Sequence, residues 1–246
     1  MRGVEGSDSS PVTPEDLAAL HPRLYHVTTP GALPDIFRHG LLPTSALLNL
    51  LAVPAAERPA IEAERRSGSI TLHHPVHGTA TITDNLPLSV RALAACLDDG
   101  LQPADWLRLL NARVFLWADR AGLDRLLNAR LNRTRPRDVL VFDTLGLATA
   151  CMGRVEISAI NSGATIRRPA RRGLGTFTPL ECHPYATWRR LRGQHDRILE
   201  VTILGGVPEP AAHLVDHWTV PAASASDFLP GVHRGQERGR TPPDGR

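Results

Sequence analysis

Short apolar patterns with helical and with extended spacing alternate along the central part of this chain. Where apolar residues recur at intervals of three or four after a proline or a polar residue, the pattern predicts an amphipathic helix. The predicted helices are residues 14–20, 30–39, 44–51, 57–67, 87–98, 103–110 and 123–131. Thr13 is placed to cap the first of them.

Extended apolar runs predict the strands. They cover residues 24–28, 113–118, 138–143, 155–161 and 198–204. Residues 70–83 are also β-like, with histidines in their turn region. Helices crowd the first half of the chain and strands the second, which differs from the strict alternation of a doubly wound sheet. We therefore predict an α+β fold with a mixed or antiparallel sheet and helices concentrated in the N-terminal half.

The ends of the chain differ in composition from its centre. The start is polar and rich in proline and serine, and the end is rich in proline, glycine and arginine, a composition that does not support a packed core. No internal repeat or linker divides the rest. We predict a flexible tail over residues 1–14, a single domain over 15–222 and a disordered tail over 223–246.

Composition predicts a cytoplasmic protein without a membrane partner. No stretch approaches the roughly 18 to 20 apolar residues that cross a bilayer, and the polar N-terminus lacks an apolar signal core. Cys96, Cys151 and Cys182 are far apart and show no metal-ligand spacing, so buried free thiols are expected. All 28 basic residues are arginines. Because arginine binds phosphates bidentately, the composition is compatible with a nucleotide or nucleic-acid partner. The net charge of only +3 does not by itself indicate such a partner.

Missing motifs exclude several enzyme classes. The sequence has no GxGxxG after a strand, no P-loop, no HExxH and no GxSxG, which excludes kinases, P-loop NTPases, zincins and α/β-hydrolases. His73, His74 and His77 invite a metal interpretation, but no cysteine or carboxylate stands beside them at ligand spacing. We interpret this segment as a solvated polar turn and predict no metal site.

Two segments at opposite ends of the domain carry candidate chemistry. One is the strand with His26, followed by a helix and Gly40; the other is the strand with Glu200, followed by Gly206, Val207 and Pro208. A carboxylate among apolar neighbours is costly unless it has a task or a partner, but an edge-strand glutamate facing water is an equal alternative. For the histidine the alternative is a core residue bonded to backbone.

These segments resemble the ADP-ribosyltransferase superfamily, specifically its DarT-like branch of bacterial toxins that modify DNA. Tyr-His-x-Thr at 25–28, the following helix into Gly-Leu and the late strand with its lone glutamate carry the likeness. The chain is also similar to an uncharacterised bacterial family that shares Leu-Asn-x-Arg-Val-Phe-x-Trp at 110–117 and Asn-Ser-Gly at 161–163. The resemblance implies a split β-sheet and NAD as a substrate. It also implies an acceptor such as a DNA or RNA base, and an antitoxin protein as a partner.

The resemblance also implies residue roles. His26 takes the place of the first-strand residue that holds NAD, and Glu200 that of the catalytic glutamate, so the two strands are expected to lie side by side. Phe115, Trp117 and Ser158 are alternative candidates for the middle motif. Further candidate contacts to NAD are Tyr25, Val27, Thr28, Thr44, Arg65 and Arg113, together with Phe115 and Trp117. Candidate contacts to the second substrate are Asn161, Ser162 and Arg172.

Each of these contacts has a structural alternative. Aromatics on strands are often core, Asn-Ser-Gly is a common turn, and runs of arginine such as 167–172 and 189–192 are usually solvated faces. Two other functions stay open: an RNA 2'-phosphotransferase-like enzyme that also consumes NAD, and a non-catalytic module that binds a nucleotide or nucleic acid.

Overall fold

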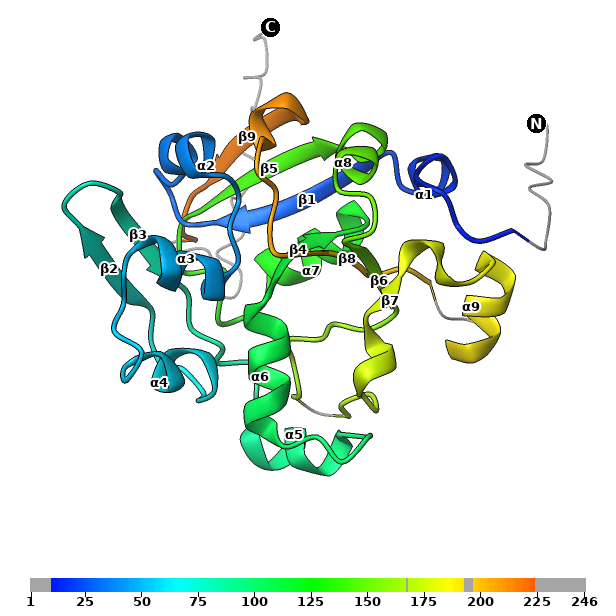
Figure 1. Ribbon diagram of the computed structural model, residues 1–246, viewed down its shortest axis with the longest axis horizontal. Helices are drawn as coiled ribbons and strands as arrows, with labels where there is room; N and C mark the ends of the chain where they lie inside the picture. Colours follow the sequence, from blue (N-terminus) through cyan, green and yellow to red (C-terminus); the bar gives the residue numbers. More distant parts are fainter. Residues whose placement is uncertain (1–9, 167, 193–196, 224–246) are drawn as a thin grey trace, which may run out of the picture.

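The computed structural model describes residues 10–166, 168–192 and 197–223, and its centre is a seven-stranded sheet (Figure 1). The strand order is β7-β6-β8-β4-β1-β5-β9, and every neighbouring pair is antiparallel. The strands are β1 (Arg23–Thr28), β4 (Arg113–Trp117), β5 (Arg137–Asp143), β6 (Val155–Ser158), β7 (Thr178–Pro179), β8 (Glu200–Leu204) and β9 (Leu214–Val220). A separate hairpin consists of β2 (Ile70–His74) and β3 (Gly78–Ile82). The predicted α+β fold with an antiparallel sheet is confirmed.

The sheet opens at its centre, between β1 and β4. These two strands share one residue pair, Tyr25 with Trp117, whereas β1 pairs with β5 along its whole length. The sheet therefore has two leaves, β7-β6-β8-β4 and β1-β5-β9. Backbone groups of β4 that face the opening need other hydrogen-bond partners, and a side chain of β1 supplies one of them.

The helices are short and concentrate before the middle of the chain, as predicted. They are α1 (Pro14–Leu20), α2 (Leu33–His39), α3 (Thr44–Leu50), α4 (Arg58–Glu62), α5 (Val90–Cys96), α6 (Pro103–Asn111), α7 (Arg120–Leu127), α8 (Thr144–Ala150) and α9 (Tyr185–Arg192). Three 3-10 turns are η1 (Leu174–Thr176), η2 (Leu180–Cys182) and η3 (Pro210–Ala212). The predicted cap of α1 is confirmed, since the Thr13 hydroxyl accepts from the Asp16 amide at 3.2 Å.

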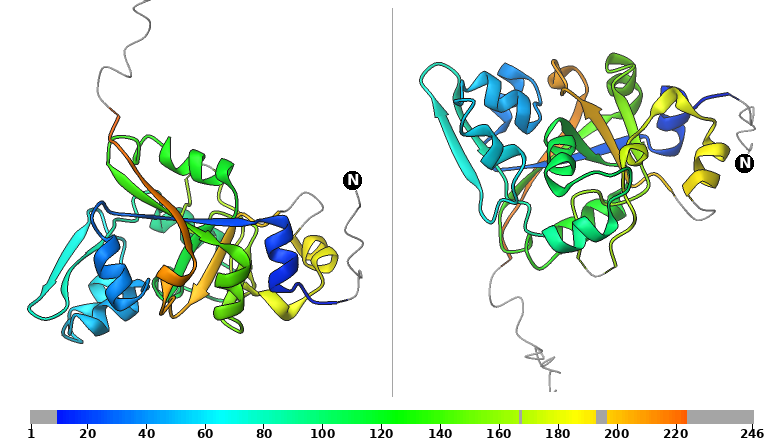
Figure 2. Two further views of the ribbon diagram at one scale, coloured as in Figure 1. Left: turned by 90° about the horizontal axis from the view of Figure 1, so that it is seen from above. Right: turned by 60° about the horizontal axis from the view of Figure 1, so that its bottom comes forward.

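Alternation along the strands gives the sheet two unlike faces. One face carries the largest core cluster, which includes Leu24, Leu116, Phe142 and Val201; α8 packs on this part of the sheet and α1 packs on α8. On the other face, the ring of Phe115 adjoins a second cluster, formed by α5, α6 and Phe177. A third cluster joins the hairpin to α3 and α4. Seen from above, α7 lies on one side of β1, and α2 and α8 lie on the other (Figure 2).

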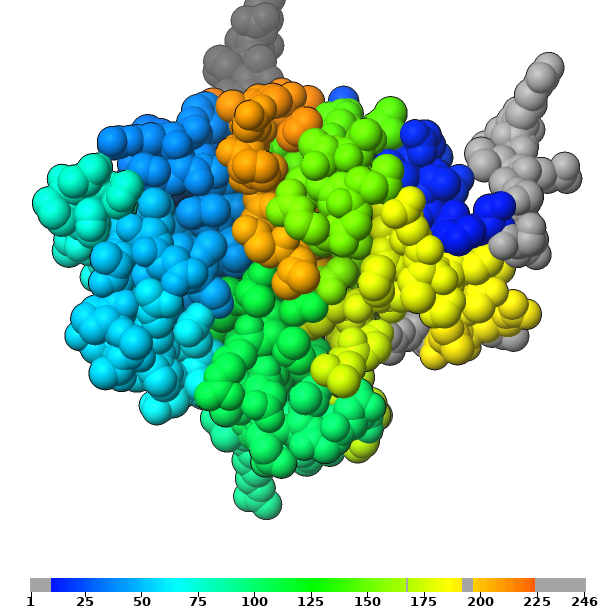
Figure 3. Space-filling view, in the orientation of Figure 1, coloured from blue at the N-terminus to red at the C-terminus, as the bar shows by residue number. Residues whose placement is uncertain are grey.

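The segment before α3 is tied to the segment after β8. Leu41 and Val207 form a β-bridge, and the backbone there is so close that a Cβ on Gly206 would lie 2.7 Å from the Leu41 carbonyl oxygen. Gly206 also has a φ of +98°, which favours glycine. In the space-filling view these two parts of the chain, blue and orange, form one continuous surface (Figure 3).

Several predicted boundaries are wrong. The helix predicted over 57–67 is limited to α4, and the one predicted over 123–131 begins earlier, because Asp119 caps α7 by accepting from the Gly122 amide at 2.6 Å. Helices α8 and α9 and strand β9 were not predicted. Val12 is buried, so the packed region begins before residue 15. Residues 1–9 and 224–246, most of the two predicted tails, lie outside the described part.

The cysteine prediction is confirmed in part. All three thiols are free, and Cys96 and Cys151 are buried. Cys182 is exposed, because it ends the surface turn η2. Within the described residues, no helix has the length and apolar character that crossing a membrane requires.

Candidate functional site

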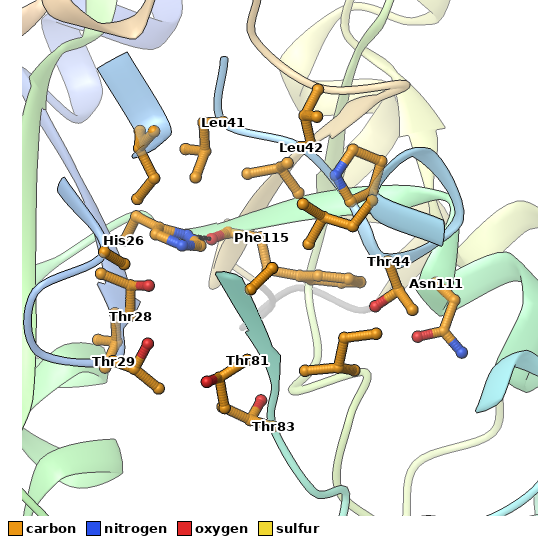
Figure 4. A pocket seen from close by; sticks show the side chains of 18 of the residues that line it. His26, Thr28, Thr29, Leu41, Leu42, Thr44, Thr81, Thr83, Asn111 and Phe115 are labelled. Atoms are coloured by element: carbon orange, nitrogen blue, oxygen red, sulfur yellow. Dashed lines mark hydrogen bonds between the residues drawn. The ribbon is translucent and has the colours of Figure 1, made fainter. Parts of the chain in front are cut away.

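A cavity of about 660 Å³ lies where the two leaves of the sheet separate, a volume within the roughly 300 to 1,000 Å³ usual for small-molecule sites. Its walls come from the end of β1, from α2 and α3, from β3 and β4, and from the loop 161–164. His26 and Phe115 lie near its centre, and Thr81 and Thr83 line another wall (Figure 4). Glu200 also lines it.

Glu200 begins β8, a central strand of its leaf. It pairs with Trp117 of β4 on one side and with Ser158 of β6 on the other. Its side chain is only 4% exposed, so the alternative of an edge glutamate facing water is wrong. The carboxylate accepts from the Ser162 amide at 3.2 Å and from the Ser162 hydroxyl at 2.7 Å.

Burial raises the pKa of Glu200 to about 7, although the hydrogen bonds from Ser162 and the charge of Arg172 act to lower that pKa. Burial removes water from the charged form and so favours the protonated one. A carboxyl that titrates near neutral pH is suited to exchange protons with a substrate.

The buried cation of Arg172 holds the loop 161–164 beside Glu200. The Arg172 guanidinium, 2% exposed, donates to the Ser162 carbonyl at 2.8 Å, and the Trp106 indole donates to the same oxygen at 3.4 Å. Ser162 and Asn161 line the cavity as predicted, but Arg172 is not among the described residues that do so. Its guanidinium positions the loop, and its predicted contact to the second substrate stays a prediction.

His26 connects the two strands where they separate. Its Nδ1 lies 2.9 Å from the carbonyl oxygen of Phe115, and burial lowers the pKa of His26. A neutral imidazole that bonds to a carbonyl oxygen must carry its proton on Nδ1. Its Nε2 is then an acceptor. His26 therefore bonds to backbone, as the structural alternative expected, and it also lines the cavity.

The expected geometry of the two predicted catalytic residues is wrong in part. Strand β4 lies between β1 and β8, so the two strands are not neighbours. Moreover, Glu200 is in register with Trp117 and hence with Tyr25, which places His26 on the opposite face by strand alternation. Both residues nevertheless line the same cavity, because the sheet opens between β1 and β4.

The three middle-motif candidates differ in their position relative to the cavity. Trp117 and Phe115 line the cavity, and the Phe115 ring meets the Phe177 ring edge-on, with 6.0 Å between centroids. Ser158 is buried and exchanges 3.3 Å hydrogen bonds with the backbone of Ile160. Ser158 is not among the described residues that line the cavity, so the geometry favours Phe115 and Trp117 over this candidate.

The remaining predicted contacts divide into two groups. Val27, Thr28 and Thr44 line the cavity. Among the described residues, Tyr25 and Arg65 are not part of the lining. Tyr25 neighbours His26 on the strand, so its side chain lies on the opposite face. Arg65 donates to the carbonyls of Leu86 and Leu88.

Arg113 lines the cavity but is already paired. Its guanidinium donates to both carboxylate oxygens of Glu156, at 2.7 and 2.9 Å, and to the Leu109 carbonyl at 2.7 Å. Few of its donors are left for a phosphate, and its predicted contact to NAD stays a prediction. In the arginine run 167–172, Arg171 pairs with Asp98 and Arg172 is buried. Arg168 is exposed, and residue 167 lies outside the described residues.

The histidines are only partly in a solvated turn. His73 bonds to Thr79 at 2.9 Å, but the His77 ring lies 4.7 Å from that of His74 and 5.3 Å from that of His39. His39 and His77 line the cavity, so the interpretation as a solvated turn is wrong for His77. Across the described ranges, no group of three or more histidine, cysteine or acidic side chains is arranged so that it could hold a metal ion.

The sequence reasoning missed several polar residues that line the cavity, namely Arg66, Thr81, Thr83, Asn111, Asn132 and Arg137. The threonines repeat at every second position from residue 79 to 83, which is a readable signal for one face of a strand. The arginines and asparagines follow no pattern that separates them from other surface residues.

A family described as a family of unknown function (DUF7002) matches residues 22–214. No curated protein matches the chain.

Proposed function

The chain belongs to this family of unknown function, and we propose that it is an ADP-ribosyltransferase that uses NAD as its substrate. It transfers ADP-ribose to an acceptor such as a DNA or RNA base. One observation carries the proposal: a buried carboxyl, Glu200, held by Ser162, lines a cavity large enough for a nucleotide. The resemblance at residues 25–28 and 198–203 supports it, as does the opening between β1 and β4.

The reaction requires a negative charge beside the ribose. When the bond between ribose and nicotinamide breaks, its electron pair leaves with neutral nicotinamide and positive charge develops on the sugar. An ionised Glu200 stabilises that charge more in the transition state than in the ground state. The acceptor atom then bonds to the same ribose carbon, and its proton moves to the Glu200 carboxylate.

The other residues at the centre of the cavity position the substrate. Nε2 of His26 accepts a hydrogen bond from a ribose hydroxyl, while its Nδ1 stays on the Phe115 carbonyl. Phe115 or Trp117 offers an aromatic surface for the nicotinamide ring. A cytoplasmic location and restraint by an antitoxin protein are part of the same proposal, as the resemblance implies.

Labelled NAD tests the proposal directly. Purified protein is incubated with NAD labelled in its adenosine half, together with DNA, RNA or cell lysate, and both nicotinamide release and label on each fraction are measured. We expect release and labelling by the native chain. Glu200→Gln is expected to lower both by on the order of 100-fold or more. Glu209→Gln, an exposed glutamate, is the matched control and keeps both. Absence of nicotinamide release and of label in every fraction contradicts the proposal.

A second function is favoured by one observation. Arg66 and Arg137 line the cavity, and a basic set without a late glutamate is what the RNA 2'-phosphotransferase resemblance requires. That enzyme also consumes NAD. Glu200→Gln separates the two functions, because it abolishes ADP-ribosyl transfer and spares 2'-phosphate removal from RNA.

A further inference from the structure

Three arginines surround one aspartate at one end of the cavity. Asp84 follows β3 and forms an ion pair with Arg135. Arg66 and Arg137 also interact electrostatically with Asp84, and both line the cavity, as Asp84 does. Because Asp84 is already paired with Arg135, it cannot also neutralise the positive charges of Arg66 and Arg137.

Arg137 is the arginine of this group with the fewest contacts. It begins β5 and is half-buried. Within the described ranges its guanidinium makes no hydrogen bond or ion pair. Burial and the neighbouring charge of Arg135 lower the pKa of Arg137, which shows that its surroundings disfavour an uncompensated positive charge. A cation kept in a cavity at this cost is a candidate ligand-binding group.

Arg66 is held rigidly at the same place. Its Nε donates to the Thr83 carbonyl at 3.0 Å, and its Nη1 to the Ile61 carbonyl at 2.5 Å and to the Asn111 side chain at 3.3 Å. Its Nη2 has no partner among the described residues. These bonds orient the guanidinium before any ligand arrives, which reduces the entropy lost on binding.

We propose that this end of the cavity binds the phosphate or diphosphate group of a nucleotide, through the guanidinium groups of Arg66 and Arg137. Paired guanidinium groups match phosphate oxygens in charge and in geometry. Thr83 on the same wall offers a hydroxyl (Figure 4). The inference deepens the proposed function, on which it rests for the ligand: in that reaction the group is the diphosphate of NAD.

Binding of ADP and of adenosine to the full chain tests the inference, because the two ligands differ only in the diphosphate. Titration calorimetry is expected to show that ADP binds at least about tenfold more tightly than adenosine. Arg137→Gln removes that preference. Arg137→Lys, which keeps the charge without the planar fork, retains part of it. Arg130→Gln changes an exposed arginine in the segment between α7 and β5 and keeps the full preference for ADP.

Equal binding of ADP and adenosine by the native chain overturns the inference, and so does an unchanged preference in folded Arg137→Gln. Circular dichroism spectra establish that each variant is folded. Glu200→Gln separates this inference from the proposed function, since it keeps the preference for ADP while transfer is lost. If the preference for ADP depends on Arg137 but the chain never releases nicotinamide, the phosphate site is supported and the proposed transferase activity is contradicted. If the chain releases nicotinamide but does not prefer ADP, the phosphate site is contradicted and the transferase proposal is not.

Discussion

Glu200 makes the folded chain less stable at the pH where it would act. Its pKa is about 7 in the folded protein, against an ordinary value of 4.5. Between these values the folded state holds a proton that the unfolded state has lost, so the free energy of unfolding falls as the pH rises through this range. The total loss is on the order of 3 kcal/mol above pH 7. A buried carboxyl with no function would be replaced at a gain in stability.

Glu200→Gln therefore has a pH-dependent effect on stability. The amide does not ionise, so the free energy of unfolding of the variant should rise relative to that of the native chain by on the order of 3 kcal/mol between pH 5 and pH 8. Urea unfolding at both pH values measures it. Glu209→Gln should follow the native chain, because that side chain is exposed. Parallel curves for Glu200→Gln and the native chain would contradict a raised pKa.

Ser162→Ala tests the hydrogen bond that holds the carboxylate. Its hydroxyl lies 2.7 Å from Glu200 and lowers the pKa of that carboxyl. Without it the pKa rises further, so the pH midpoint of nicotinamide release should move to higher pH. The matched control is Ser158→Ala. Ser158 is also buried and is paired with Glu200 in the sheet, but its hydroxyl bonds to the backbone of Ile160 and not to the carboxylate. Equal midpoints in both variants would show that the Ser162 bond does not tune the carboxyl.

At the scale of elements, an ion pair joins three strands of the leaf that carries Glu200. Arg113 of β4 reaches Glu156 of β6 across β8, whose Thr202 also donates to Glu156 at 3.0 Å. The two charged side chains are only 10% and 11% exposed. Removing one partner leaves the other charge buried and unpaired, which costs more than the pair itself contributes.

Arg113→Met should lower the free energy of unfolding by about 3 to 5 kcal/mol, and Arg113→Met combined with Glu156→Leu should recover most of the loss. Urea unfolding measures both. The control is Arg120→Met, which breaks an exposed pair with Asp124 and should cost less than about 1 kcal/mol. A double variant that is less stable than the single one would mean that the pair itself holds the strands together.

Elements with strong local periodicity could be predicted from the sequence, and those without it could not. The predicted strands at 24–28, 113–118 and 138–143 agree with β1, β4 and β5 to within one residue at each end, since apolar runs mark strands buried in a sheet. Strand β9 was missed because none of its residues is fully buried. Helix α8 was missed because it directly follows β5 and its buried face, at Thr144, Leu147 and Ala148, contains only one large apolar residue.

The site shows the same division. His26 and Glu200 were identified as residues of one site, and both line the cavity. That β4 separates their strands could not be predicted, because local periodicity does not encode strand order. Arg65 was predicted to contact NAD, yet of the two adjacent arginines Arg66 lines the cavity and Arg65 does not. The two adjacent side chains follow a helix that ends at Glu62, beyond which spacing does not determine direction.

At the scale of the whole molecule, the cavity depends on segments far apart in the chain. Its walls include β1 and α3 from the first part, and Glu200 from the last. The bridge between Leu41 and Val207 holds α3 next to the end of β8. A ligand that fills the cavity would contact both leaves of the sheet and strand β3 of the hairpin, so it should restrict the motion of segments that have no direct contact with one another.

Hydrogen exchange of Glu200→Gln with and without NAD measures this coupling. The variant should bind NAD without consuming it, so the complex persists during labelling. We expect slower exchange at the end of β1, in α3 and over residues 79–85, because ligand binding suppresses the local opening of all these walls at once. Helix α1, outside the cavity lining in the described chain, serves as the internal control and should exchange at an unchanged rate. Protection limited to one wall would mean that NAD does not span the opening between β1 and β4.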